Sequence, residues 1–91
     1  MNAPQVENMR SSNGNQVPNQ FRIITDEGVY FQSYSTMIAF VPRDGSTPTL
    51  DARKWDYSTT TSKYRNLFMH MDTKETKRRI KGGSIILANL N

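Results

Sequence analysis

The spacing of apolar residues changes once along this chain, near Trp55, and that change most constrains its fold. Before it, apolar and β-branched residues gather in short runs with the two-residue period of β-strands. After it, four apolar residues recur at the spacing of one helical face: Tyr64, Leu67, Phe68 and Met71. Strands followed by helices are typical of the α+β class.

Four segments have strand character by composition and period: 21–25, 29–34, 36–41 and 47–52. The run 36–41 is apolar on both faces, which predicts a central strand covered on each side. Pro48 has no N–H to donate to a neighbouring strand, so segment 47–52 is expected at a sheet edge. A further strand is expected over 84–90, where the sequence reads SIILANL.

Two helices are expected before that last strand. Ser58, or one of the three threonines that follow it, can cap the first helix by accepting a hydrogen bond from a free backbone N–H. The second begins at Asp72, with Glu75 three residues later, and ends at Gly82 and Gly83. The predicted fold is α+β, with a small, mostly antiparallel sheet of four to five strands packed against one amphipathic helix and a second short helix.

The first twenty residues are polar and have neither period. They include five asparagines and two prolines, so they offer little apolar surface to offset the entropy of ordering them. We therefore expect a flexible polar N-terminal arm over 1–20 and a single α+β domain over 21–91. A domain of that size has a small core, which a homodimer or another partner would stabilise.

The sequence lacks the residues that several kinds of chemistry require. The chain has no cysteine, which excludes disulfides, thiolate metal sites and a cysteine nucleophile. The one histidine, His70, has no carboxylate a helical turn away. We therefore expect no enzyme and no metal or other cofactor. No apolar run approaches the roughly 18 residues of a membrane helix, so no membrane contact is expected.

The net charge of +4 is unevenly distributed. Residues 53–91 contain nine basic and three acidic residues, whereas 21–52 contain two basic and four acidic ones. On the second helix Lys74, Arg78 and Lys81 project from one side, and Lys77 flanks them. Such a stripe is suited to the phosphates of a nucleic acid. A basic run of this length is more often a solvated helix end, where the macrodipole favours cations.

Aromatic residues lie near some of these cations. Arg53 and Lys54 precede the only tryptophan, Trp55, and two tyrosines share a strand face. Exposed rings can stack on the bases of a single strand, although a lone tryptophan in a domain of this size is usually buried, which favours Trp55 as a core anchor. The candidate contact residues for nucleic acid or another partner are Arg53, Lys54, Lys63, Lys74, Lys77, Arg78 and Lys81, and the candidate stacking residues are Tyr30, Tyr34 and Trp55.

The stretch from residue 28 to residue 89 resembles a family of small proteins encoded by tailed bacteriophages. The residues that carry the resemblance are 33–36, 38–40, 50–51, 55–58, 60–66, Phe68 and 81–90. The resemblance implies a phage-encoded protein that works in the cytoplasm of the host bacterium. It implies no activity, cofactor or site residue, and it leaves out the polar segment 1–20.

These observations predict a non-enzymatic binding protein. The first choice of partner is DNA or RNA, bound through the basic C-terminal half. The alternative is a phage inhibitor of a host protein, such as a defence effector or a transcription or replication enzyme, which acts by direct protein–protein binding. A structural role in the virion is a third possibility.

Overall fold

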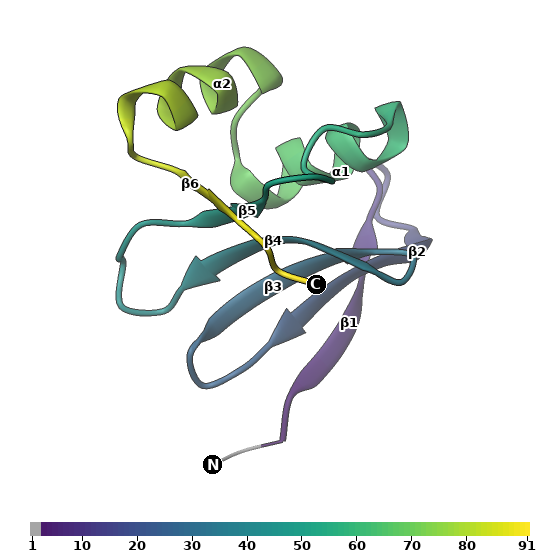
Figure 1. Cartoon of the computed structure of the whole chain (residues 1–91). Helices are drawn as coiled ribbons and strands as arrows, with labels where there is room; N and C mark the ends of the chain where they lie inside the picture. The colour runs from purple at the N-terminus through teal and green to yellow at the C-terminus, as the bar shows by residue number, and fades with distance from the viewer. Residues whose placement is uncertain (1–2) are drawn as a thin grey trace.

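The computed structural model describes residues 3–91, in which two helices lie on one side of a twisted six-stranded sheet (Figure 1). The elements, in chain order, are β1 (Gln5–Arg10), β2 (Gln16–Ile24), β3 (Gly28–Ser33), β4 (Thr36–Pro42), β5 (Thr49–Asp51), α1 (Thr59–Met69), α2 (Thr73–Gly82) and β6 (Ile86–Ala88). The α+β class and the mostly antiparallel sheet are confirmed. The sheet has more than the four to five strands predicted because β1 was not foreseen.

The strands follow one another across the sheet in the order of the sequence. Each neighbouring pair from β1 to β5 is antiparallel, and β6 is parallel to β5. β5 therefore lies inside the sheet, and the prediction of an edge position for it is wrong. Pro48 precedes the strand, so its missing N–H removes no ladder bond, and its carbonyl accepts a hydrogen bond from the Ile86 N–H at 3.0 Å.

The sequence predicted a flexible arm over 1–20, and this prediction is wrong from residue 5 onwards, where β1 begins. Residues 1 and 2 lie outside the residues that the structure describes. β1 pairs with β2 in antiparallel register, with Val6 opposite Ile23 and Asn8 opposite Phe21. Met9 is buried and reaches the core. The other side chains of β1 are mostly exposed. Backbone hydrogen bonds to β2 hold this edge strand in place. Such bonds do not depend on the side chains, so the strand has no recognisable side-chain pattern.

The core lies between the sheet and α1. Phe31 of β3 stacks on Phe68 of α1, with ring centroids 5.6 Å apart. Tyr64 is buried beside Phe68, as predicted, but Leu67 is 46% exposed. The buried face of α1 instead includes Thr61, whose hydroxyl oxygen lies 3.1 Å from that of Ser33 in β3. The predicted stripe is therefore correct for Tyr64 and Phe68 and wrong for Leu67, and Met71, beyond the end of α1, packs partly against the core.

The helix ends follow the predicted capping chemistry. Ser58 caps α1 through its side chain, which accepts a hydrogen bond from the Thr61 N–H at 3.1 Å. Asp72 caps α2 by accepting one from the Glu75 N–H at 2.7 Å. α2 stops at Gly83, whose φ of 86° suits glycine and lets its N–H reach carbonyls of the last turn.

Within residues 3–91 the helices cover one face of the sheet only (Figure 1). The prediction that residues 36–41 are covered on both faces is therefore not met. Ile38 and Ala39 are fully buried, and a bulge in β4 next to them shifts the register of its pairing with β3. Phe40 points to the opposite, open face, where it is only partly buried.

Candidate nucleic-acid interface

The exposed side of α2 carries four cationic side chains. Thr76 is fully buried, and its hydroxyl donates to the Asp72 carbonyl at 2.8 Å. Ile80, one turn further, packs partly against the core. The burial of Thr76 and the partial burial of Ile80 show which side of the helix faces the protein. The cationic residues that remain exposed are Lys74, Lys77, Arg78 and Lys81.

Glu75 holds two arginines of α2 in place. Its carboxylate accepts hydrogen bonds from Arg78 at 2.8 and 2.6 Å, and from Arg79 at 2.7 Å. The bonds from Arg78, and then those from Arg79, lower the pKa of Glu75 to about 2. Arg78 is oriented by this pair and yet has a side chain that is 70% exposed. The stripe thus combines one pre-oriented guanidinium with three ammonium groups.

A second group of cations follows β5, where a buried carboxylate shapes the chain. Asp51 accepts hydrogen bonds from the backbone N–H groups of Arg53 and Lys54 at 3.2 and 2.9 Å, and from the Leu90 N–H at 2.9 Å. Burial opposes the charged form of Asp51, but these bonds and one from Asn91 outweigh it and lower the pKa of the carboxyl. The two cationic side chains project outward from a fixed turn, and both are exposed.

A pocket of about 450 Å³ opens beside this turn. Arg53 and Lys54 line one part of it, and Ser35 and Thr36, at the turn between β3 and β4, line another. Tyr34, in the same tight turn, has a φ of 55° and is 57% exposed. The pocket therefore has two cations and the Asp51 carboxylate on its wall, and an exposed aromatic ring in an adjoining turn.

The other rings are placed differently. Tyr57 is 45% exposed, and the Nζ of Lys54 lies 5.1 Å from its ring centroid. This residue was not among the predicted stacking residues, although it follows Lys54 by three positions. Trp55 is partly buried against the core, with the Arg65 guanidinium 5.0 Å from its ring centroid. Tyr30 lies on the open face of the sheet against Phe40, with centroids 4.5 Å apart.

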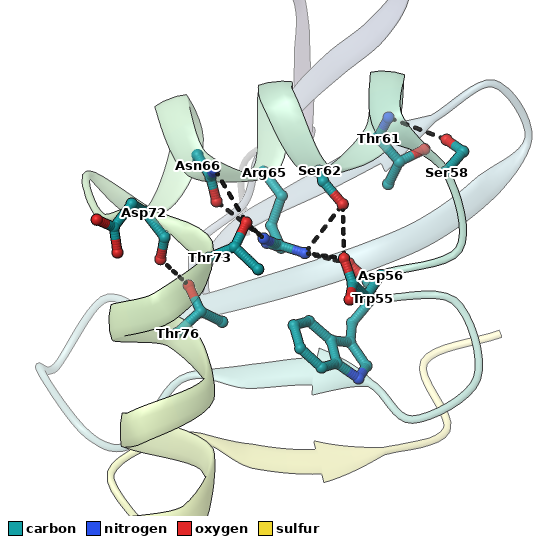
Figure 2. A network of polar contacts seen from close by, with 10 residues as sticks. All are labelled: Trp55, Asp56, Ser58, Thr61, Ser62, Arg65, Asn66, Asp72, Thr73 and Thr76. Atoms are coloured by element: carbon teal, nitrogen blue, oxygen red, sulfur yellow. Dashed lines mark hydrogen bonds and ion pairs between the residues drawn. The ribbon is translucent and has the colours of Figure 1, made fainter.

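Arg65 joins α1 to the turn after β5 and to the start of α2 (Figure 2). One end of its guanidinium donates to the Trp55 carbonyl at 2.6 Å and approaches Asp56 at 3.4 Å. The other end donates to Asn66 Oδ1 at 2.8 Å and to Thr73 Oγ1 at 2.9 Å. The network therefore fixes the relative positions of the segments that carry the two groups of exposed cations.

The burial of Arg65 was not foreseen from the sequence. Its side chain is fully buried, and its Nε has no hydrogen-bond partner within residues 3–91. Burial lowers the pKa of the guanidinium, and the hydrogen bond with Asp56 partly offsets this. Of the nine basic residues in 53–91, Arg65 is thus not available to a ligand. Arg65 lies between Tyr64 and Phe68 on the buried face of α1, and this position was the one sequence signal that could have predicted its burial.

Lys63 is exposed on α1 and belongs to neither group of cations. Its Nζ lies 5.4 Å from the Tyr64 ring centroid. His70 caps the C-terminus of α1 with a φ of 58° and is exposed. Across residues 3–91, no three His, Asp or Glu side chains are grouped as metal ligands. Over the same residues, neither helix has the length and apolar character needed to span a bilayer.

A family model matches residues 5–83, which is most of the chain and includes β1 and β2. The chain belongs to the DUF8033 family, a family of unknown function. The match begins well before residue 28, so the family pattern extends into the segment that the sequence assigned to a separate arm. No curated protein and no solved structure shows significant similarity to the chain.

Proposed function

We propose that this DUF8033 protein is a non-enzymatic nucleic-acid-binding protein. The observation that carries the proposal is the exposed stripe of α2, where Lys74, Lys77, Arg78 and Lys81 face away from the buried Thr76. The resemblance to phage proteins supports a phage-encoded protein that acts in the cytoplasm of a host bacterium.

The dimensions of the stripe suit a phosphate backbone. Lys74 and Lys81 are seven residues apart, which is about 10 Å along a helix. One strand of B-DNA presents about three phosphates over that length of the duplex axis, and long lysine side chains can span the wider spacing of those phosphates along the strand. Arg78, oriented by Glu75, can offer its outer N–H groups to a phosphate between those bound by the lysines.

The turn after β5 would supply contacts of a second kind. Arg53 and Lys54 can bind phosphates, while the exposed rings of Tyr34 and Tyr57 can stack on unpaired bases. Stacking requires bases that are not already paired within a duplex. We therefore expect single strands to bind more tightly than duplexes of the same length.

The test is a fluorescence-anisotropy titration of the full chain with single- and double-stranded oligonucleotides at several salt concentrations. The unmodified protein should lose affinity steeply as salt rises. The triple variant Lys74→Ala, Arg78→Ala and Lys81→Ala should flatten the plot of log K against log salt by about 2–3 units, at roughly 0.7–0.9 per phosphate contact.

A matched control removes the same charge elsewhere. Arg10, Arg22 and Arg43 are exposed residues of the N-terminal half, and their replacement by Ala should leave the slope nearly unchanged. Equal losses in the two triple variants would mean that net charge alone drives binding. Absence of binding at about 50 mM salt would refute the proposal, because salt screens phosphate contacts less at this concentration than at higher ones.

The same preparation discriminates the alternative predicted from the sequence. A stoichiometric host protein retained from nuclease-treated lysate, without oligonucleotide binding, would favour an inhibitor of that protein. Detection of the chain by mass spectrometry in purified phage particles would favour a virion role.

A further inference from the structure

The open face of the sheet carries a continuous row of side chains across all six strands. The pairing register aligns one residue of each strand: Val6, Ile23, Tyr30, Phe40, Thr49 and Ile86. Phe31, next to Tyr30 in the chain, stacks on Phe68 of α1 and thereby marks the opposite, helix-covered face. The row is apolar except at Thr49 and the tyrosine hydroxyl, and Val6 and Ile86 at its ends are 63% and 50% exposed.

A second row lies beside the first. The register aligns Asn8, Phe21, Gln32 and Met37 on the same face. None of the ten side chains in the two rows is charged, although the chain as a whole carries many charges. An antiparallel sheet with one solvated face normally presents polar and charged residues there. This face instead has the composition of a contact surface.

We infer that the open face of the sheet binds the same face of a second copy of this chain, forming a two-fold symmetric dimer. The two-sided apolar pattern of residues 36–41 indicates that β4 is covered on both sides, and the helices of its own chain cover one. Face-to-face packing of two sheets would cover the other side, as in a β-sandwich. A two-fold contact pairs the same patch on both copies, which an uncharged row permits without repulsion between like charges.

The size of the face fits this occupant. Four strands of about 20 Å and two short ones of about 10 Å, spaced about 4.8 Å apart, give a face of roughly 500 Å² per copy. Two such faces bury roughly 1,000 Å², close to the lower limit of a specific protein interface. Interfaces at this small end of the range are typically weak and transient, so we expect a dissociation constant of about 1–100 μM.

A polyanion is a poorer occupant of the same face. Phosphate binding requires cations, and neither row supplies one. The exposed cations of α2 are on the helix-covered side of the sheet (Figure 1). The inferred dimer therefore does not depend on the proposed nucleic-acid contact at α2. Experiments can refute either one and leave the other unaffected.

The test is the mass of the full chain in solution, measured by sedimentation equilibrium over a range of concentrations. The unmodified protein should approach twice its 10.5 kDa monomer mass at high concentration. The double variant Val6→Lys and Ile86→Lys should raise the dimer dissociation constant by about 100-fold, because dimerisation would bury two unpaired ammonium groups per copy. Leu67→Lys is the matched control: an exposed apolar residue of α1, on the other side of the sheet, whose replacement should leave the mass unchanged.

Two results would overturn the inference. One is a monomer at every concentration up to about 1 mM, well above the expected dissociation constant. The other is a dimer that persists in the double variant, because the contact would then lie elsewhere. If the double variant fails to fold by circular dichroism, an NMR dilution series of the unmodified protein decides. The NMR signals of Ile23 and Tyr30 should then shift with concentration while those of Leu67 stay fixed. The reverse pattern would refute the open face as the dimer contact.

Discussion

Replacing Arg65 by methionine tests whether neutral acceptors or an ion pair hold the buried guanidinium. Methionine keeps much of the volume but removes the donors to the Trp55 carbonyl, Asn66 and Thr73. Acceptors left unsatisfied in a buried site cost about 1–3 kcal/mol each, and the desolvation cost of the arginine itself is recovered. We expect a net loss of about 3 kcal/mol in the free energy of unfolding. That is a large share of the roughly 5–14 kcal/mol typical of a chain this size.

Asp56→Asn is the comparison that makes the result decisive. The carboxylate of Asp56 is 37% exposed and 3.4 Å from the guanidinium, so its charge should contribute less than about 1 kcal/mol. In urea denaturation, Arg65→Met should lower the midpoint by about 2 M, at a slope of about 1–1.5 kcal/mol per M. Asp56→Asn should lower it by well under 1 M on the same scale. Equal losses would show that the ion pair dominates and would refute this interpretation.

Four further substitutions probe single positions. Gly28→Ala should cost more than about 2 kcal/mol, because the added Cβ would lie 2.3 Å from the Val41 carbonyl oxygen. Gly82→Ala, with open space around the new atom, should not destabilise, and urea midpoints compare the two. Glu75→Gln should reduce the fall in stability between pH 4.5 and about 2, because the folded-state pKa lies below its ordinary 4.5 and the stabilisation is lost as pH falls. Parallel acid titrations by circular dichroism test this. Tyr34→Asn should keep or slightly raise the unfolding midpoint, since Asn tolerates the φ of 55°, while weakening single-strand binding in anisotropy titrations.

The parts of the fold that follow from side-chain chemistry were predictable. Hydroxyl and carboxylate caps at Ser58 and Asp72, and the glycine stop at Gly83, depend on neighbours in the sequence. Strands β3 and β4 were visible because their residues alternate or are apolar throughout. The exposed cations of α2 follow from helical spacing and a single half-buried apolar residue, Ile80.

The parts that the sequence missed depend on distant partners. β1 is held mainly by backbone hydrogen bonds to β2 and by one buried residue, Met9, so its side chains carry no period. Leu67 is exposed because Thr61 and Arg65 share the buried face of α1, which rotates that face away from the apolar stripe. A charged residue such as Arg65 is expected at the surface. Its burial is possible because hydrogen-bond acceptors from three segments, the turn after β5, α1 and the start of α2, bind its guanidinium.

The α2 stripe and the open face lie on opposite sides of the sheet, and this leads to a last prediction. If the open faces pair, each dimer presents two α2 stripes on its two outer sides. Such a dimer can bind two nucleic-acid segments at once, and the second contact gains from the effective concentration that the first creates. We therefore expect the unmodified protein to bridge long single strands, seen as rising light scattering at substoichiometric protein. The double variant Val6→Lys and Ile86→Lys should bind a short oligonucleotide at least as tightly, because its added lysines attract phosphates, yet fail to bridge. Bridging by a variant shown to be monomeric would contradict this link between dimer and function.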